Sequence, residues 1–267
     1  MAFEKLHVSR ERPWSVRSQC ERRERLYMKD ILRRQLQIAG IAASEEQVER
    51  LAHFFDLVVE RNKVMNLTTI TEPEEAARLH FVDSLMLLKY LPLEDGSSLA
   101  DIGTGAGFPG IPLKIMRSEL HVTLVDSLQK RLSFLEEVIE TLSLRDSGEI
   151  CTAHGRAEDL AGRRGALRER FDVVTARAVA ALPVLSELCL PFVKEGGLFV
   201  AYKTETADEE AQDAAHALRE LGGTLQRIEQ YTLPASDIRR SLIFIQKTGK
   251  TPVRYPRQAG TPAKKPL

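Results

Sequence analysis

The sequence predicts an α/β protein with a doubly wound, mostly parallel sheet of seven strands, preceded by an N-terminal helical cap. Three observations support this fold class. A glycine-rich turn at 103–110 follows a short apolar run. After it, strand-length and helix-length apolar segments alternate along the chain, which is typical of a parallel sheet with helices on both faces. The last two strand-like segments are joined by a link too short for a crossover helix, so they must be antiparallel.

The region before the first strand is expected to be helical. Residues 1–25 are assigned to a loosely ordered polar extension, although the helical pattern already begins near Ser18 and continues to Ala39. Ser44 and Gln47 form a capping box that opens a second helix, and a polar connector follows from Arg61. Pro73 begins a third helix with a buried apolar stripe. Residues 26–93 are therefore predicted to form the helical cap.

Residues 94–247 are predicted to form the sheet domain. Strands are expected near 98–102, 121–126, 149–153, 171–176, 198–202, 225–233 and 240–246. The helices between them are expected near 110–117, 128–143, 156–161, 181–190 and 206–221. Residues 248–267 are expected to form a basic C-terminal tail, because no acid occurs there. The cations near this end are Lys247, Lys250, Arg254, Arg257, Lys264 and Lys265.

The glycine-rich turn is the candidate ligand-binding element. Gly103, Gly105 and Gly107 allow positive φ and a close approach of the backbone, and the free N–H groups of the turn favour a polar or anionic ligand. Asp126 ends the next strand 23 residues after Gly103, near the spacing of about 20 at which an acid binds ribose hydroxyls in such folds. Two simpler interpretations stay open, namely a tight turn without a ligand and a helix cap at Asp126.

The details of the turn favour S-adenosylmethionine over NAD. A dinucleotide fingerprint requires glycine where this chain has Phe108. Asp101 stands two residues before the first glycine, and an acid there suits a cationic amino-acid group better than a pyrophosphate.

Composition narrows the class of protein further. The chain has 267 residues, 43% of them hydrophobic, and a formal net charge of zero. The three cysteines, Cys20, Cys151 and Cys189, are widely spaced and match neither a metal site nor a disulfide framework. No apolar stretch reaches the length of about 18 residues needed to span a membrane, and the N-terminus lacks the pattern of a signal peptide. We therefore expect a cytoplasmic protein without a metal.

Several motifs in order resemble one known family. They are Asn66-Leu67-Thr68, the stretch 80–84, the stretch 101–112, Asp126-Ser127-Leu128 with Lys130-Arg131, and Arg177-Ala178. Together they resemble the RsmG (GidB) family of bacterial methyltransferases, which modify N7 of one guanine in 16S ribosomal RNA. The resemblance covers roughly residues 28–247. It implies a class I S-adenosylmethionine-dependent methyltransferase fold, with 16S ribosomal RNA or an assembling small ribosomal subunit as partner.

The resemblance also implies roles for individual residues. The residues implied at the cofactor are Asp101, Gly103, Thr104, Gly105, Gly107, Phe108, Asp126, Ser127, Ala157, Glu158 and Arg177. The residues implied at the RNA are Asn66, His80, Lys203, Arg239 and Arg240. Simpler roles stay open for several of them: Glu158 as a first-turn helix acid, the three RNA cations as solvated charges, and Asn66 and His80 as a tie between cap and sheet.

The chemistry at the fourth strand agrees with N7 as the target atom. Enzymes that methylate exocyclic amines often carry an Asn/Asp-Pro-Pro-aromatic motif there, whereas this chain has Thr175-Ala176-Arg177-Ala178. Guanine N7 has a free lone pair and no proton to remove, so the enzyme needs proximity and alignment and no general base. Arg177 is expected to position the base, because arginine stays protonated. The alternative is a structural arginine paired with an acid such as Glu158 or Asp126.

Two rival functions remain at the level of sequence. One is a non-catalytic RNA-binding or assembly protein that has kept a methyltransferase fold, and the other is a methyltransferase acting on small molecules or proteins. Binding of S-adenosylmethionine would distinguish an rRNA methyltransferase from the first rival. Methyl transfer to 16S RNA would distinguish it from the second. We expect a monomer.

Overall fold

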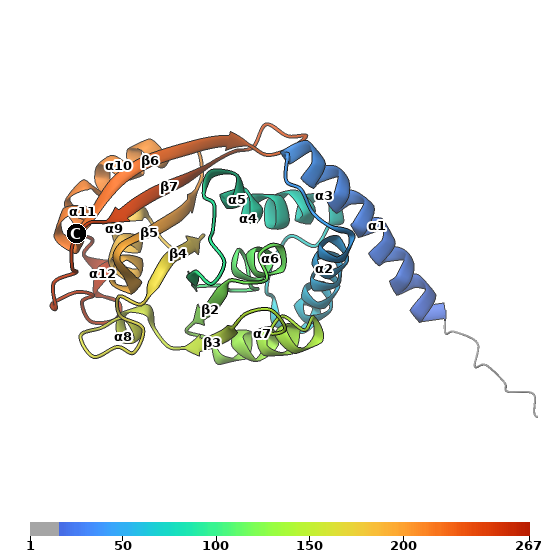
Figure 1. The fold of residues 1–267 in the computed structure, drawn as a ribbon, viewed down its shortest axis with the longest axis horizontal. Helices are drawn as coiled ribbons and strands as arrows, with labels where there is room; N and C mark the ends of the chain where they lie inside the picture. The colour runs from blue at the N-terminus through green and yellow to red at the C-terminus, as the bar shows by residue number, and fades with distance from the viewer. Residues whose placement is uncertain (1–15) are drawn as a thin grey trace, which may run out of the picture.

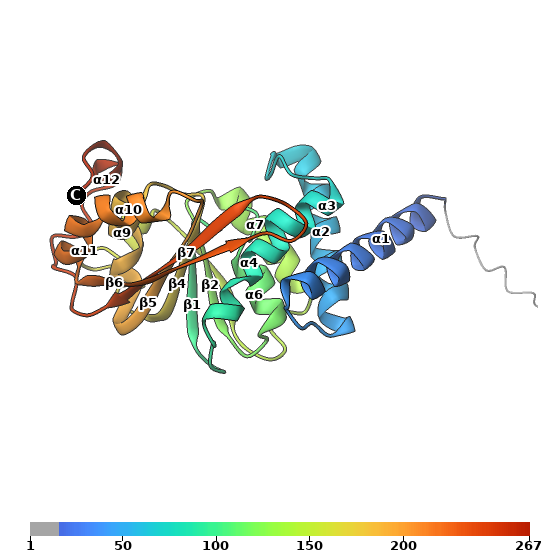
Figure 2. The ribbon, with the colours of Figure 1, turned by 90° about the horizontal axis from the view of Figure 1, so that it is seen from above.

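The computed structural model describes residues 16–267, and its centre is one sheet with the strand order β3-β2-β1-β4-β5-β7-β6 (Figures 1 and 2). The strands are β1 (Ser98–Ile102), β2 (His121–Asp126), β3 (Ile150–His154), β4 (Phe171–Arg177), β5 (Val193–Lys203), β6 (Gly223–Thr232) and β7 (Arg239–Lys247). Strands β1 to β5 pair in parallel, whereas β7 is antiparallel to both β5 and β6. The predicted doubly wound, seven-stranded fold is therefore confirmed, including the antiparallel end of the sheet.

Helices cover both faces of this sheet. Those that follow the first strand are α6 (Gly110–Met116), α7 (Gln129–Thr141), α8 (Ala157–Leu160), α9 (Leu182–Cys189), η2 (Leu190–Phe192), α10 (Ala207–Asp213) and α11 (Ala215–Leu221). Successive side chains along β7 point to opposite faces of the sheet and pack into two different cores. Leu242 and Phe244 join the core beneath the N-terminal helices and α6, while Ile243 and Ile245 join the core beneath α9 and α11.

The N-terminal helices form the expected cap on one face. They are α1 (Val16–Ala39), α2 (Glu45–Met65), α3 (Pro73–Ala76), the π-helix η1 (Ala77–Val82), α4 (Asp83–Leu85) and α5 (Leu87–Tyr90). The capping box at Ser44 and Gln47 is present. The ring centroids of Phe54 and Phe81 lie 5.0 and 5.3 Å from that of Phe108. Cap and sheet therefore share one core, and the boundary expected near residue 93 does not separate two cores.

Two expected boundaries in this region are wrong. Helix α1 begins at Val16, inside the interval 1–25 assigned to a loose extension, because the stretch is rich in helix-forming residues and contains neither glycine nor proline. Helix α2 continues to Met65, so the expected connector from Arg61 begins only after it. The rest of the proposed extension, residues 1–15, lies outside the described residues.

The C-terminal segment 248–267 is packed against the sheet domain, which corrects the expectation of a basic tail. Thr251 and Tyr255 are buried, and the guanidinium of Arg168 donates hydrogen bonds to both of their carbonyl oxygens. Arg257 pairs with the carboxylate of Glu187, which is buried on α9. Helix α12 (Thr261–Lys264) follows this ion pair. The segment is held because a buried carboxylate needs a cationic partner, which local sequence does not reveal.

The cations of this segment are consequently not all available to RNA. The ammonium group of Lys247 is buried and donates to the carbonyl oxygen of Leu190 at 2.9 Å, and burial lowers its pKa to about 8. Arg254 pairs with Glu220. Lys250, Lys264 and Lys265 are exposed.

Candidate active site

The glycine turn leads from β1 into α6 and is hydrogen-bonded to the end of β2. The amides of Gly103 and Thr104 both donate to the carbonyl oxygen of Val125, and the amide of Gly105 donates to Asp126 Oδ2 at 3.1 Å. Gly103 and Gly105 have φ values of 71° and 60°, in the left-handed region that favours glycine. A Cβ atom on Gly105 would have only the carbonyl oxygen of Gly103 within 4 Å, at 3.9 Å. The turn is therefore open to a ligand above Gly105.

Asp126 lies beside this turn, as its spacing predicts. Its Oδ2 binds the amide of Gly105, and its Oδ1 accepts a hydrogen bond from the amide of Leu128 at 2.9 Å, just before α7. Arg131 also lies 3.3 Å from Oδ2. Asp126 thus fastens the glycine turn and the segment that leads into α7. The alternative of a helix cap is wrong, because Leu128 is the N-cap residue of α7 and no side chain caps this helix.

The other members of the glycine-rich stretch have mainly structural contacts. Asp101 is fully buried, with Oδ2 accepting from the amide of Gly110 and Oδ1 lying 3.2 Å from Thr175 Oγ1, and burial raises its pKa to about 6. This burial contradicts the expectation that Asp101 faces a cationic ligand group, because the carboxylate ties β1 to β4 and α6. Thr104 is also buried. A Cβ atom on Gly107 would lie 2.8 Å from a side-chain carbon of Ile111, so this glycine serves packing.

Phe108 and His80 stack on each other beneath the cap. Their ring centroids are 4.6 Å apart with an interplanar angle of 15°, and Phe108 is only 5% exposed, which leaves little of its ring for a cofactor. His80 Nε2 lies 2.9 Å from Thr68 Oγ1. Burial, with a smaller contribution from the charge of Arg177, lowers the pKa of His80 to about 3. The imidazole is therefore neutral and ties the segment after α2 to the cap.

Asn66 does not join His80 in the site. It caps the C-terminus of α2 in the left-handed conformation, with φ of 49°, and its side chain is exposed. It is absent from the residues that line the pocket described below. His80 therefore lines this pocket and Asn66 does not, and a role of His80 in holding the base stays a prediction.

Arg177 ends β4 and is anchored to the cap. Its Nη1 donates to the carbonyl oxygen of Leu79 at 3.0 Å and to Asp83 Oδ2 at 3.1 Å. The accepting carbonyl belongs to the π-helix η1, a type of distortion that is frequent at functional sites. The guanidinium lies 5.5 Å from the ring centroid of Phe108. The alternative interpretation from the sequence paired this arginine with Glu158 or Asp126. Both of these partners are wrong, because the partner is Asp83.

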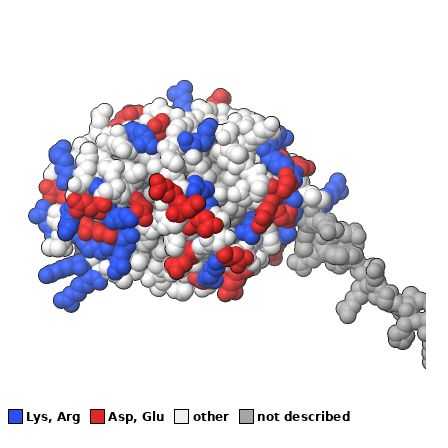
Figure 3. Space-filling model, viewed as in Figure 1, with Lys and Arg blue, Asp and Glu red and all other residues white. Residues whose placement is uncertain are grey.

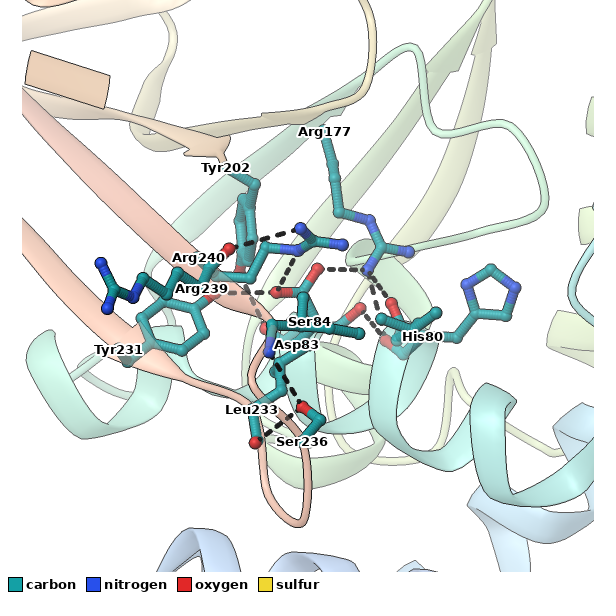
Figure 4. Close-up of polar contacts among 12 residues, drawn as sticks. His80, Asp83, Ser84, Arg177, Tyr202, Tyr231, Leu233, Ser236, Arg239 and Arg240 are labelled. Carbon is teal, nitrogen blue, oxygen red and sulfur yellow. Dashed lines mark hydrogen bonds and ion pairs between the residues drawn. The ribbon is translucent and has the colours of Figure 1, made fainter. Parts of the chain in front are cut away.

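Asp83 connects Arg177 with the antiparallel end of the sheet (Figure 4). Its Oδ1 accepts a hydrogen bond from the hydroxyl of Tyr231 at 2.8 Å and lies 3.8 Å from Arg240 Nε. The hydroxyl of Tyr202 donates to the carbonyl oxygen of the neighbouring Ser84 at 2.7 Å. Burial, and next the negative charge of Asp83, raise the pKa of Tyr231 far above its ordinary value. One carboxylate therefore holds the cap, β4 and the β6–β7 hairpin together.

A pocket of about 390 Å³ opens above this network, within the usual size range of ligand sites. Its lining residues come from the cap, from the ends of β4, β5 and β7, and from α10. They are Ile70, Leu79, His80, Asp83, Arg177, Ala178, Tyr202, Lys203, Thr204, Glu210 and Arg240. In open α/β sheets ligands bind at the carboxyl edge of the parallel strands, and this pocket lies at that edge.

The pocket and the glycine turn are neighbours. Ala178 lines the pocket, and the next residue, Val179, lies over the turn, because a Cβ atom on Gly103 would come within 2.7 Å of its Cγ2. The structure therefore brings Arg177 and the glycine turn together, as the sequence predicts, with the segment after β4 between them.

The three expected RNA cations differ in their surroundings. Lys203 is only 9% exposed and pairs with Glu210 at 2.6 Å, so it is not a free surface charge. Arg240 is directed toward Asp83, whereas Arg239 is exposed and points away from this network (Figure 4). Among the side chains of residues 23–267, Arg239 has no ion-pair partner. It is the one of the three that fits the simple expectation of an exposed cation.

The remaining predicted cofactor residues follow β2 and β3, which lie on the side of β1 away from β4 and the pocket. Ser127 is exposed directly after Asp126, and Ala157 begins α8. Glu158 lies in the first turn of α8, and its Oε1 accepts a hydrogen bond from the amide of Gly260 at 3.1 Å. Glu158 therefore helps to hold the C-terminal segment, which agrees with the simpler interpretation of this acid.

Sequence reasoning missed the acids of the pocket. Asp83 stands out in the sequence only as part of the motif 80–84, and Glu210 belongs to an acidic run that looks like the solvated first turn of a helix. No local signal distinguishes them, because their partners Arg177 and Lys203 come from other elements. The surface in Figure 3 is also uninformative about this site: acidic and basic side chains are mixed, and Lys and Arg gather mainly at the end that carries α8.

Comparisons with known proteins point to one family. The model of the family described as rRNA small subunit methyltransferase G (GidB) matches residues 47–241. The chain is 52% identical over 228 residues to ribosomal RNA small subunit methyltransferase G of Desulfitobacterium hafniense (strain Y51), covering 85% of this chain and 92% of that protein. It is 48% identical over 232 residues to the protein of the same name from Lachnoclostridium phytofermentans, covering 87% and 94%.

A solved structure supports the fold alone. It is a branched-chain polyamine synthase C9 mutein from Thermus thermophilus, in complex with N4-aminopropylspermidine and 5'-methylthioadenosine. The TM-score is 0.53 at 14% sequence identity, with 76% of this chain and 64% of that chain covered. Among the described residues, no helix is both long and apolar enough to cross a lipid bilayer. The family match and the curated relatives confirm the predicted resemblance, and the chain belongs to the rRNA small subunit methyltransferase G family.

Proposed function

We propose that the protein transfers a methyl group from S-adenosylmethionine to N7 of one guanine in 16S ribosomal RNA of the small ribosomal subunit. The observation that carries this proposal is the pocket at the carboxyl edge of the sheet, lined by Arg177 and directly adjacent to the glycine turn. A base in this pocket and a cofactor on the turn would be neighbours, which is what an in-line transfer requires.

The glycine turn fits the cofactor. It is open above Gly105, and the carboxylate of Asp126 lies at the end of β2, where an acid can bind ribose hydroxyls. Ser127 and Ala157 would border the nucleoside on the exposed side of the turn. When bound, S-adenosylmethionine supplies a methyl group made electrophilic by the adjacent sulfonium. Gly103, Gly105 and Asp126 would bind and orient it.

The residues of the pocket support alignment and not base catalysis. Guanine N7 carries a lone pair and no proton, so no side chain has to remove one. Arg177 stays protonated and is fixed by Leu79 and Asp83, which suits it to donate hydrogen bonds to O6 of guanine or to a phosphate. Arg177→Ala is expected to lower turnover about tenfold to a hundredfold, since a bidentate contact contributes about 1–3 kcal/mol.

We further propose 16S RNA, either free or in an assembling small subunit, as the partner of a monomeric protein. A ribosomal RNA substrate places the reaction in the cytoplasm. Arg239 is exposed in a second hollow, which shares Arg240 with the pocket of the site, and it would contact the RNA backbone. The affinity for RNA should then fall with salt, by about 0.7 in the log–log slope for each phosphate contacted on a single strand.

The decisive experiment is transfer of labelled methyl groups to 16S RNA, followed by mapping of the modified base. Free 16S RNA and isolated small subunits are offered in parallel, because the two differ in which bases are accessible. We expect one labelled guanine that is cleaved under conditions specific for N7-methylguanine. Label on an exocyclic amine or on ribose, or cofactor binding without transfer to either substrate, would contradict the proposal.

A further inference from the structure

One wall of the pocket carries a lysine and a glutamate in direct contact. Lys203 Nζ donates to Glu210 Oε2 at 2.6 Å and to the carbonyl oxygen of Ala180 at 2.7 Å. The amide of Leu182, the first residue of α9, donates to the same oxygen of Glu210 at 2.8 Å. The side chains of Lys203 and Glu210 are only 9% and 22% exposed. The pair is therefore a fixed part of the pocket and not a loose surface contact.

The second carboxylate oxygen of Glu210 is free to accept a hydrogen bond. Two donors bind this side chain, and both reach Oε2; no donor from residues 23–267 reaches Oε1. Glu210 itself lines the pocket. Glu210 Oε1 is not among the buried side-chain atoms that lack a partner, so it is open to the pocket, and a ligand N–H group can make a charge-assisted hydrogen bond to it.

We propose that Glu210 is a specificity-determining residue that recognises the Watson–Crick edge of the target guanine, an inference that rests on the proposed function. Glu210 Oε1 accepts a hydrogen bond from N1–H of the base, while Lys203 beside it donates to O6. Bases taken out of a stack are commonly read by hydrogen bonds on this edge.

Such a reader is needed because N7 does not distinguish the two purines. Adenine also presents N7 as an acceptor. On the Watson–Crick edge, however, guanine offers an acceptor at O6 next to a donor at N1, and adenine offers a donor at N6 next to an acceptor at N1. The order of Lys203 and Glu210 complements guanine. With adenine in the same place, the donor Lys203 would face the donor N6, and the acceptor Glu210 Oε1 would face the acceptor N1.

Glu210→Gln is the sharpest test. The backbone amide of Leu182 and the ammonium of Lys203 both require an acceptor where Oε2 lies, so the oxygen of the new side-chain amide keeps that position and both hydrogen bonds. Its NH2 group then replaces Oε1 and meets N1–H, donor against donor. Glu209→Gln is the matched control, because Glu209 is an exposed neighbour on α10 and the change of charge is the same.

We expect kcat/KM for 16S RNA to fall about tenfold to a hundredfold in Glu210→Gln and to stay near wild type in Glu209→Gln. Affinity for S-adenosylmethionine should stay close to wild type in both variants. The melting temperature of Glu210→Gln is expected to fall, because Lys203 keeps its hydrogen bond but loses its counter-charge, so activity is measured well below that temperature. If Glu210→Gln methylates guanine as efficiently as Glu209→Gln, the inference is wrong.

A second arm uses the wild-type protein and does not depend on the folding of any variant. The 16S RNA is assembled by ligation with inosine or 2-aminopurine at the mapped position. Inosine keeps O6, N1–H and N7 and should be methylated, whereas 2-aminopurine lacks O6 and N1–H and should not. Equal methylation of 2-aminopurine and guanine would overturn the role of Glu210 while leaving the proposed function intact. Absence of transfer to unmodified RNA would overturn the proposed function itself and this inference with it.

Discussion

The ion pair between Asp83 and Arg177 gives the most direct test of how the site is held together. The two side chains are 5% and 14% exposed, so neither charge is well solvated once its partner is lost. Removing one member of a buried ion pair typically costs about 3–5 kcal/mol, because the other charge is left without compensation. We expect Asp83→Asn to lower the free energy of unfolding by about 3 kcal/mol, at the lower end, since asparagine still accepts a hydrogen bond from Tyr231 or Arg177.

The partner variant and the double variant complete a thermodynamic cycle. Arg177→Met keeps the length of the side chain and leaves Asp83 with Tyr231 and the more distant Arg240, so a similar loss of about 3 kcal/mol is expected. The double variant should be more stable than the sum of the single losses predicts, by about 2 kcal/mol, because it leaves neither of these two charges unpaired.

Equilibrium unfolding in urea measures all four proteins, with the slope of each transition checked for constancy. Losses that add to within about 0.5 kcal/mol would refute the reasoning, because they would show that the two residues stabilise the fold independently.

Three further outcomes can be measured. Gly105→Val should abolish most of the calorimetric affinity for S-adenosylmethionine, whereas Gly96→Val, whose φ of 77° carries the same strain in open space, should leave that affinity unchanged. The pKa of His80 is lowered from 6.5 to about 3, so the unfolded state binds the extra proton between these values and stability is lost as the pH falls through this window. Relative to His80→Gln, the wild type should lose up to about 1.4 kcal/mol of unfolding free energy per pH unit there, and parallel pH profiles would contradict the burial of the imidazole. Arg257→Ala leaves Glu187 buried without its cation and should lower stability by about 3 kcal/mol, so an unchanged melting temperature would show that the C-terminal segment is not docked.

Much of the fold follows from local sequence. The alternation of strand and helix segments and the glycines after β1 are short-range patterns, set by hydrophobic periodicity and backbone sterics, and the structure confirms the sheet that they predict. The short link before β7 leaves only an antiparallel pairing with β6, which the register shows. The capping box at Ser44 is equally local, because its hydrogen bonds span three residues.

The proximity of Asp126 to the glycine turn also follows from the sequence, because the carboxyl ends of adjacent parallel strands meet at one edge of the sheet. For the same reason Arg177 could be placed near the turn from its position at the end of β4.

Only the tertiary structure decided which charges are free and which are paired. Arg177 and Asp83 are 94 residues apart, and Arg257 and Glu187 are 70 residues apart, so no local pattern links them. The sequence treats Lys203 and the cations of the C-terminal segment as exposed charges, yet several of them are held by acids from other elements. The cause is physical: the cost of burying a charge depends on what surrounds it after the chain has folded, and a residue's neighbours in sequence do not specify those surroundings.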